Sequence, residues 1–443
     1  MDSRALRSAA PLSLPSGARG EAVASERTAT AYARDESLSV GPEHEGESRV
    51  YLRDNLPVMA ALEKERGSAF KLAYLDPPFN TGRAFAEYDD ARSREEWLAM
   101  MRPRLVLARA LLRDDGALVA EIDDTELGSL QCLLDEVFGA KNRVSTITVL
   151  RSAATGHKAK NRGPVNVSDF LLLYAKDKTR FLPNPIFKRR DGIDPAYGTF
   201  VENPDDDPSE LRFVPLGKAA ARAAGHPTAR TARAALGLGW EDHLTRFARA
   251  HARQIVRFAQ VRFEAVSREA QELVKASKSS PGRVLRLARQ GLPDLLLRDG
   301  NRILFLASKM RSLTSSGTVD PSGASPTVPC EPLTNVWTDI PFQGIAREGG
   351  VVFVRNKKPE RLLERIVALT TCEGDWVLDP FLGSGTTAAV ATTMRRPWVG
   401  IESGEHGETL AIPRLGRVVR GTDQTGIRAR RAISYEGGFG VYR

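Results

Sequence analysis

Two separated parts of the chain show short apolar runs that alternate with stretches in which apolar residues recur every three or four positions. The short runs predict buried strands, and the longer spacing predicts amphipathic helices. In the first part, the expected strands are 72–75, 117–122, 144–150 and 170–175, and the expected helices are 55–64, 94–112 and 127–138. In the second part, the expected strands are 376–378, 398–401 and 417–419, and the expected helices are 359–370 and 386–394. This alternation predicts a parallel, doubly wound α/β sheet built from both parts.

The stretch between these two parts has a different, basic composition. Residues 216–290 contain fifteen Lys or Arg against five Asp or Glu. Four of the arginines follow one another at helical spacing, with phenylalanines nearby: Arg246, Arg249, Arg253 and Arg257. A stripe of this density predicts contact with phosphate groups, and the alternative is a solvated helix face. An acidic stretch at 202–208 and a stretch rich in Ser, Thr, Gly and Pro at 314–329 are expected to be loops.

The two ends of the chain lack these patterns. Residues 1–47 are rich in Ala, Ser, Gly, Arg and Glu, and they are expected to be a disordered extension. The remaining boundaries follow from the apolar pattern: a first half of the α/β domain at 48–178, a basic insertion at 179–335, a second half at 336–425 and a C-terminal tail at 426–443.

Composition narrows the class of protein. The chain has 443 residues, and its formal net charge of +9, with a sequence pI near 9.5, favours a polyanionic partner, most often a nucleic acid. Its three cysteines are far apart and form no Cys-x-x-Cys pair. This supports neither a disulfide framework nor a zinc site, and it indicates a reducing, cytoplasmic location. No stretch approaches the roughly twenty apolar residues of a membrane span.

A first candidate site follows the expected strand 72–75 directly. It consists of a carboxylate, two rigid prolines and an aromatic ring: Asp76, Pro77, Pro78 and Phe79. The Asp76 carboxylate and the Pro77 carbonyl are placed to accept the two N–H bonds of an exocyclic base amine, which frees the nitrogen lone pair for attack on a methyl group. Phe79 is placed to stack on the ring of the base. The alternative is an ordinary turn at the end of a strand.

A second candidate site lies between the expected strand 376–378 and the helix that begins at 386. Its glycines, Gly383 and Gly385, allow a nucleotide-like cofactor to approach the backbone, and Glu402 after the next strand is placed to accept hydrogen bonds from ribose hydroxyls. A phosphate-binding loop is not supported, because no Lys follows Gly385. A nicotinamide-binding turn is weakened, because Ala388 stands where a third glycine is expected. For Glu402 the alternative is a helix-capping or surface acid. Together, the two sites predict methyl transfer from S-adenosylmethionine to a base amine.

These two segments, in this order, resemble those of β-class amino DNA methyltransferases, and more narrowly the modification subunits of type III restriction-modification systems. The matching stretches, which include these two segments, are 74–82, 122–126, 136–139, 337–340, 357–362 and 377–387. The resemblance runs from about residue 50 to about residue 421 and is weakest in the basic insertion. It implies a Rossmann-like, circularly permuted methyltransferase sheet whose insertion recognises the target sequence. Phe79 departs from the commoner Tyr, a change that should preserve stacking.

The resemblance also implies roles for individual residues. The target amine, on a base flipped out of the duplex, would be bound by Asp76, Pro77, Pro78 and Phe79. The cofactor S-adenosylmethionine would be bound by Asp379, Phe381, Gly383, Gly385, Glu402, Lys358, Pro359 and Glu360. No metal is expected.

An Asp at the first position of the first segment resembles the pattern of adenine-N6 enzymes more than that of cytosine-N4 enzymes. The implied partners are double-stranded DNA, a second copy of the chain and a separate restriction subunit. Two alternatives stay open, namely a cytosine-N4 methyltransferase on the same scaffold and a DNA-binding protein without turnover.

Overall fold

The computed structural model describes residues 32–41, 47–84, 89–152, 164–320, 322, 325–352, 357–427 and 437–443. The chain divides into Met1–Tyr32 and Ala33–Arg443, and all the helices and strands named below belong to the second unit.

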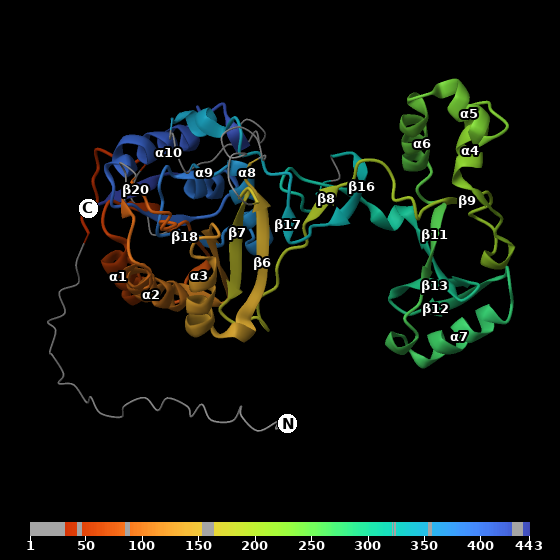
Figure 1. Ribbon diagram of the computed structural model, residues 1–443, viewed down its shortest axis with the longest axis horizontal. Helices are drawn as coiled ribbons and strands as arrows, with labels where there is room; N and C mark the ends of the chain where they lie inside the picture. Colours follow the sequence, from red (N-terminus) through yellow and green to blue (C-terminus); the bar gives the residue numbers. More distant parts are fainter. Residues whose placement is uncertain are drawn as a thin grey trace, which may run out of the picture. The chain divides into compact units, whose positions relative to one another are not determined.

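A nine-stranded sheet forms the centre of the α/β domain (Figure 1). Its strands are β1 (Ser48–Tyr51), β2 (Phe70–Leu75), β5 (Leu112–Ile122), β6 (Arg143–Leu150), β7 (Ser168–Ala175), β17 (Val336–Trp337), β18 (Trp376–Asp379), β19 (Trp398–Ile401) and β20 (Phe439–Tyr442). They lie in the order β17-β6-β7-β5-β2-β18-β19-β1-β20. Strands from both parts of the chain therefore meet where β2 pairs with β18, as the apolar pattern predicts.

The sheet is mixed, because β7 is antiparallel to both β5 and β6, whereas the other pairs are parallel. The prediction of a wholly parallel sheet is therefore wrong at β7. An apolar run identifies a buried strand but carries no information about its direction, which depends on how the neighbouring strands are connected.

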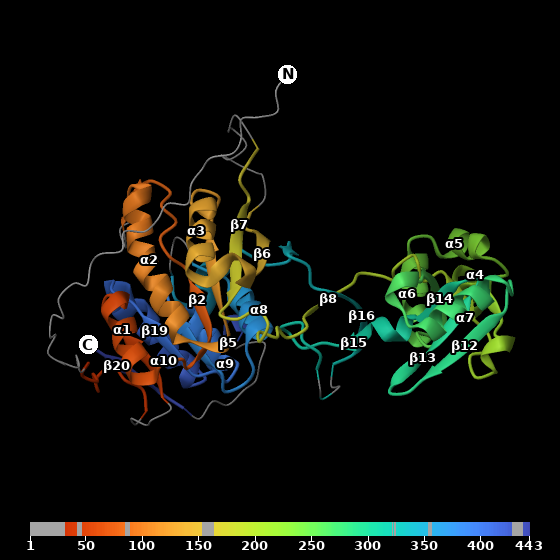
Figure 2. The same ribbon diagram turned by 90° about the horizontal axis from the view of Figure 1, so that it is seen from below.

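Helices cover both faces of this sheet (Figures 1 and 2). One face is covered by α1 (Asn55–Arg66), α2 (Arg94–Leu111) and α3 (Leu127–Leu134), and the other by α8 (Glu360–Thr370), α9 (Thr386–Thr393) and α10 (Ile412–Val419). The predicted strand 417–419 is wrong, because these residues end α10. Val418 and Val419 favour strands locally, but Val418 lies three positions after the buried Leu415 and packs on the same helical face.

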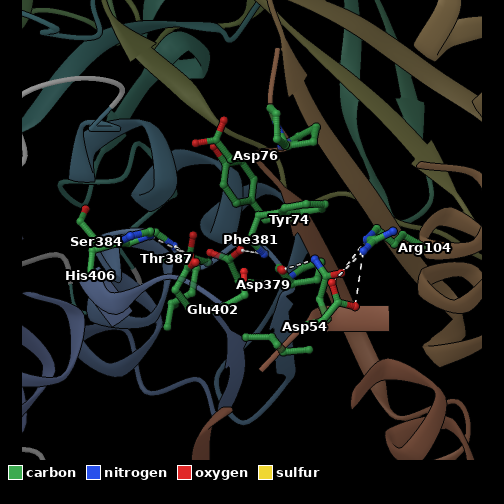
Figure 3. A pocket seen from close by; sticks show the side chains of 18 of the residues that line it. Asp54, Tyr74, Asp76, Arg104, Asp379, Phe381, Ser384, Thr387, Glu402 and His406 are labelled. Carbon is green, nitrogen blue, oxygen red and sulfur yellow. Dashed lines mark hydrogen bonds and ion pairs between the residues drawn. The ribbon is translucent and has the colours of Figure 1, made fainter. Parts of the chain in front are cut away.

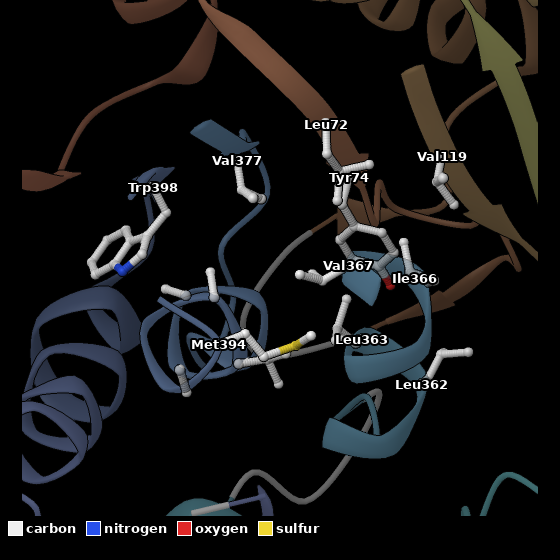
Figure 4. Close-up of a cluster of buried hydrophobic side chains, with 14 of the residues drawn as sticks. Leu72, Tyr74, Val119, Leu362, Leu363, Ile366, Val367, Val377, Met394 and Trp398 are labelled. Carbon is white, nitrogen blue, oxygen red and sulfur yellow. The ribbon is translucent and has the colours of Figure 1, made fainter. Parts of the chain in front are cut away.

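The main core lies between the sheet and the second helical layer (Figure 4). Helix α8 presents four buried side chains at helical spacing, Leu362, Leu363, Ile366 and Val367, and these meet side chains of the central strands such as Leu72 and Val377. Burying this apolar stripe fixes the helix against β2 and β5. The start of α8 is thereby placed next to the carboxyl ends of both strands.

The basic insertion forms a six-stranded sheet of its own, in the order β10-β9-β11-β14-β13-β12. Its strands are β9 (Thr199–Val201), β10 (Phe213–Pro215), β11 (Ile255–Gln260), β12 (Val284–Arg289), β13 (Leu292–Arg298) and β14 (Asn301–Phe305). Its helices are α4 (Leu216–Ala223), α5 (Ala229–Leu236), α6 (Gly239–Ala250) and α7 (Arg268–Lys278). All its strand pairs are antiparallel.

A small three-stranded sheet lies on the connections to the insertion, formed by β8 (Phe187–Arg189), β15 (Met310–Ser312) and β16 (Thr327–Pro332). The prediction of a loop at 314–329 is therefore wrong at its end, where β16 pairs with β15 and β8. Both connections are bonded to α8 or its end. Asn184 Nδ2 donates to the carbonyls of Ala368 and Thr371, at 2.9 Å each, and the Ser315 hydroxyl donates to Glu364 Oε1 at 2.6 Å.

The described residues at the two ends of the chain are part of the α/β domain. Strand β20 pairs in parallel with β1, and bridges join Arg34 to Tyr442 and Val40 to Phe439. The prediction that 426–443 is a tail outside the domain is therefore wrong for β20. The prediction of disorder up to residue 47 is wrong for 33–41, whereas residues 1–31 and 42–46 lie outside the described residues. The four residues of β20, which follow two glycines, are too short an apolar pattern to predict a strand.

We expect Phe439→Ala to lower the free energy of unfolding by about 3–5 kcal/mol, as is typical for truncation of a buried phenylalanine. Phe439 is fully buried, and its ring centroid lies 5.8 Å from that of Trp398. Urea unfolding followed by circular dichroism measures the change. Leu238→Ala is the control, because Leu238 is fully exposed and its loss should change stability by less than about 0.5 kcal/mol. Equal, small effects of both variants would contradict a structural role for β20.

Candidate active site

Three neighbouring strands, β2, β18 and β19, end at one edge of the sheet, and an acidic residue stands at each end. Asp76 follows β2, Asp379 is the last residue of β18, and Glu402 follows β19. All three line one cavity of about 240 Å³ (Figure 3). This volume is several times the roughly 30 Å³ of one water molecule, so the cavity has room for an organic ligand.

The segment that follows β2 is held in shape by its neighbours. The indole Nε1 of Trp97, on α2, donates to the Pro78 carbonyl at 2.8 Å. Asn80 has a φ of +60° and is held on both sides, because its Nδ2 donates to Glu126 Oε1 at 3.0 Å and its Oδ1 accepts from the Arg92 backbone N–H at 2.9 Å. The turn that carries Asp76 is therefore fixed by the side chains of Trp97 and Glu126 and by the backbone N–H of Arg92.

A buried ammonium group joins Asp76 to a second carboxylate. Lys358 Nζ lies 3.0 Å from Asp76 Oδ1 and 3.3 Å from Glu121 Oε1. Glu121, near the end of β5, is fully buried, and its Oε2 accepts a hydrogen bond of 2.5 Å from the Tyr74 hydroxyl. Lys358 Nζ also lies 4.5 Å from the centre of the Phe79 ring, as in a cation–π contact. One cation thus contacts both the carboxylate and the aromatic ring of the segment after β2.

Burial is the main cause of the raised pKa values of the carboxyl groups at this site. It raises the pKa of Asp76 to about 7, against the opposing effect of Lys358, and the negative charges of Glu121 and Asp379 add to the rise. Asp169 on β7 is raised to a pKa of about 6, again mainly by burial. Burial lowers the pKa of Lys358, but its carboxylate neighbours outweigh burial and raise this pKa above the ordinary value. Lys358 therefore stays charged, while Asp76 can gain and lose a proton near neutral pH.

The glycine-rich side of the cavity is organised around Glu402. Its two carboxylate oxygens accept from the backbone N–H groups of Gly383 and Gly404, each at 2.8 Å, and His406 Nε2 lies 3.2 Å from Oε2. Gly383 has a φ of +53°, a conformation that favours glycine. A side chain at position 404 would collide with the His406 ring. Glu402 thus fixes the backbone on this side of the cavity, and the glycines at 383 and 404 place no side chain there.

Asp379 and residues of α1 complete the cavity. The Asp379 Oδ1 accepts from the Phe381 N–H at 3.0 Å, and burial raises the pKa of its carboxyl to about 7 although this bond and Thr387 oppose the rise. Asn55 Nδ2 donates to the Pro380 carbonyl at 2.7 Å, and Arg104 Nε donates to Asn55 Oδ1 at 2.6 Å. These bonds fix the turn after β18.

The geometry combines an acidic, aromatic segment with a glycine-rich turn and a second acid at one sheet edge. A family model described as DNA methylase matches residues 70–412, which is more than half of the chain.

The chain belongs to the DNA methylase family.

Two curated relatives cover most of this chain. One is the "Probable type III restriction-modification enzyme HindVI Mod subunit" of Haemophilus influenzae, 27% identical over 418 residues, which are 88% of this chain and 53% of that protein. Another is the type II methyltransferase M.EcaI of Enterobacter cloacae, 27% identical over 384 residues, which are 82% of this chain and 70% of that protein. The chain therefore spans about half the length of the first relative and about two thirds of the second.

Among solved structures, the M1.HpyAVI–SAM complex is similar with a TM-score of 0.38 at 12% identity. The match covers 83% of this chain and 98% of that chain.

Most of the residues predicted for the site line the cavity. They are Asp76, Pro77, Pro78, Phe79, Lys358, Asp379, Phe381, Gly383 and Glu402. Residues that the sequence analysis did not assign also line it, namely Arg53, Asp54, Asn55, Tyr74, Arg92, Met100, Arg104, Pro380, Leu382, Ser384, Thr386, Thr387, Ile401, Ser403 and His406. Which ligand each of these residues binds stays a prediction.

Three predicted cofactor residues are not among those that line the cavity: Pro359, Glu360 and Gly385. Glu360 is buried, with its Oε1 accepting from Arg414 Nη2 at 2.7 Å and its Oε2 from the Ile427 N–H at 2.6 Å. Pro359 precedes α8 as its cap, and Gly385, with a φ of +78°, caps α9. Both carboxylate oxygens of Glu360 are thus engaged within the protein, where the bond to Arg414 joins α8 to α10, and its predicted contact with a cofactor stays a prediction.

Sequence reasoning also missed Glu121, which reaches the active site from inside the sheet. A signal for it exists, because an acid within the otherwise apolar run 117–122 has to find a buried partner. Asp169 at the start of the run in β7 carries the same signal, and it forms an ion pair of 3.3 Å with Arg151. Across the described residues, no group of three or more His, Cys, Asp or Glu could hold a metal ion.

The predicted arginine stripe of the insertion is interrupted. Helix α6 ends at Ala250 and strand β11 begins at Ile255, so the four arginines do not share a helix face. Arg246, Arg249 and Arg253 are exposed. Arg257 instead lies on β11, 3.9 Å from Asp194 Oδ2 and 5.4 Å from the centre of the Tyr197 ring.

We expect the free energy of unfolding of the Asp76→Asn variant to increase relative to that of the wild type as the pH rises. The folded pKa of about 7 lies above the ordinary value of 3.8, so between these values only the unfolded state loses its proton. Wild-type stability relative to the variant should therefore fall as the pH rises from 4 to 7 and then level off, by about 4 kcal/mol in total, since each pKa unit corresponds to about 1.4 kcal/mol. Urea unfolding of both proteins at several pH values measures this difference. A difference independent of pH would contradict the raised pKa.

Proposed function

We propose that the protein transfers a methyl group from S-adenosylmethionine to N6 of an adenine flipped out of double-stranded DNA. The observation that carries this proposal is that Asp76 and Phe79 line the same cavity as Gly383 and Glu402. A site for a flat, amine-bearing ring and a site for a nucleoside thus share one space. Membership of the DNA methylase family supports the same reaction.

The donors and acceptors on the glycine-rich side fit S-adenosylmethionine. Carboxylates of Glu402 and Asp54 suit the hydroxyls and the ammonium group of such a cofactor, and Phe381 and Ile401 offer apolar surface to its adenine ring. The positive φ of Gly383 removes the side chain where a ligand must approach the backbone closely. When bound, S-adenosylmethionine supplies an electrophilic methyl group.

The segment after β2 is suited to hold the target amine. Trp97 engages the Pro78 carbonyl, which leaves Asp76 and the Pro77 carbonyl as the acceptors proposed for the two N–H bonds of the amine. Phe79 is proposed to stack on the base and keep its nitrogen facing the cofactor. The nitrogen attacks the methyl carbon as the bond from that carbon to sulfur breaks, and a proton then leaves the nitrogen. Positioning of this kind can contribute roughly 7–11 kcal/mol.

Asp76, with a pKa of about 7, is a reasonable acceptor for the departing proton. No stronger base is needed, because the nitrogen becomes acidic only after it has gained the methyl group. An Asp at the start of this segment favours adenine-N6, and cytosine-N4 transfer on the same scaffold is the alternative. Nucleoside mass spectrometry of modified DNA separates the two.

The basic insertion is proposed to contact DNA phosphates through Arg246, Arg249 and Arg253, which are exposed, whereas Arg257 is withdrawn from this set because Asp194 and Tyr197 engage it. A second copy of the chain and a separate restriction subunit are proposed as partners, since the Haemophilus influenzae relative is named as a subunit of a restriction-modification enzyme. A bacterial cytoplasmic location is proposed with them. In the described part of the chain, no helix is long and apolar enough to cross a membrane.

We expect Asp76→Ala to abolish methyl transfer and to leave cofactor affinity within about twofold, because its carboxylate is assigned to the amine and not to the cofactor. Mass-spectrometric detection of N6-methyladenine in DNA from expressing cells measures transfer, and calorimetry with S-adenosylhomocysteine measures cofactor binding. The wild-type protein is the matched control. Loss of cofactor binding together with transfer would make Asp76 a structural residue, and an unmodified genome with the wild type would count against the proposed reaction.

We expect Arg249→Ala to reduce the slope of log affinity for DNA against log salt by about one, since each phosphate contact contributes about 0.9 to this slope. Arg257→Ala should leave the slope unchanged, because that arginine is engaged within the insertion. Fluorescence anisotropy with a labelled duplex at several salt concentrations measures both. An unchanged slope for Arg249→Ala would return α6 to being a solvated helix face.

A further inference from the structure

The ammonium group of Lys358 makes the contacts that the target amine is proposed to make. Its Nζ is a nitrogen donor 3.0 Å from Asp76 Oδ1, and it lies 4.5 Å from the centre of the Phe79 ring. An adenine bound by this segment would bring its own amine nitrogen to Asp76 and its ring to Phe79. Both groups cannot occupy one position.

We propose that Lys358 is a placeholder for the target amine, which holds Asp76 while no base is bound and moves onto Glu121 when the base enters. Lys358 is thus a positioning residue for the methyl transfer proposed above, on which this inference rests. In the absence of DNA its ammonium group contacts the Asp76 carboxylate and the Phe79 ring, so that neither lacks a partner.

Glu121 is suited to receive the ammonium group. Its Oε1 already lies 3.3 Å from Lys358 Nζ, and this buried atom has no hydrogen-bond partner within the described residues. Its Oε2 is held by the Tyr74 hydroxyl, which fixes the orientation of the carboxylate. A short movement of Nζ would therefore replace a shared ion pair by a closer one, at little cost in desolvation because Glu121 is already buried.

The other charged groups around Lys358 favour the same movement. Asp169, on β7, also attracts the ammonium group, and Arg151 is the ion-pair partner of Asp169. Asp379 faces Asp76 from β18 and disfavours its charged form. When Lys358 leaves, Asp76 loses its nearest cation and becomes a stronger proton acceptor. Entry of the base and preparation of Asp76 for the departing proton would then be one event.

Two variants separate a placeholder from a residue that only neutralises buried charge. Glu121→Gln removes the receiving carboxylate and leaves Lys358 on Asp76, so capture of the base should weaken about tenfold. Adding Lys358→Met removes one further charge of opposite sign, which restores the net charge of the site and vacates the position of the amine. The double variant should therefore recover base capture to near the wild-type level.

The measurement uses a duplex that keeps adenine at the target position and carries 2-aminopurine as its neighbour, once methylation mapping of the wild type has located the target. The fluorescence of 2-aminopurine rises when the adjacent adenine leaves the stack, and titration gives the affinity for the flipped state. S-adenosylhomocysteine binding by each variant checks that the cofactor half is intact. A double variant that captures the base as weakly as Glu121→Gln, or more weakly, would overturn the proposal.

Crystal structures of the wild type with and without this duplex provide a second measurement that needs no variant. We expect Nζ within about 3 Å of Asp76 in the free protein and within about 3 Å of Glu121, but not of Asp76, in the complex. An unchanged contact with Asp76 in a complex with a flipped base would overturn the placeholder role. Absence of methylation and of S-adenosylhomocysteine binding by the wild type would instead refute the proposed function.

Discussion

One buried cation is the constraint on which this active site depends. The parallel strands β2 and β5 bring Asp76 and Glu121 to the same end of the sheet, where a half-buried and a fully buried carboxylate would repel each other and lose hydration. Lys358 lies between them and makes their burial tolerable. Its position comes from the start of α8, which the apolar core holds against both strands. Catalytic geometry and core packing are therefore set by the same helix.

Both halves of the chain fix the segment Asp76–Phe79, the acceptor segment, which is proposed to accept the target amine. Trp97 and Asn80 hold the turn from the first half, whereas Lys358 reaches it from the second half, nearly three hundred residues later. The joint between β2 and β18 in the middle of the sheet makes this possible, since it places the acceptor segment and the glycine-rich turn on neighbouring strands. Circular permutation thus changes the order of the motifs along the chain while their positions on the sheet stay adjacent.

The sequence predicted the features that apolar runs delimit. Asp76, Asp379 and Glu402 each stand where such a run ends, so a residue-type argument could place them at one edge. Glu121 lies inside its run, and its importance depends on which strand is the neighbour of β2, which periodicity does not reveal. The arginine stripe failed for a related reason, because the spacing continues beyond the end of α6 while the backbone turns. Likewise, the role of Glu360 was unpredictable from a motif, since its partners Arg414 and Ile427 are brought to it by folding alone.

The hydrogen bonds that tie the insertion to α8 bear on how such a protein could change its specificity during evolution. Asn184 lies before β8 on the connection into the insertion, and Ser315 lies between β15 and β16 on the connection back. Each is bonded to α8 or to the residue that follows it. A recombined recognition segment that kept these two attachment points would leave the packing of α8 undisturbed. New sequences could then be exchanged as a cassette, without rebuilding the reaction centre that the helix supports.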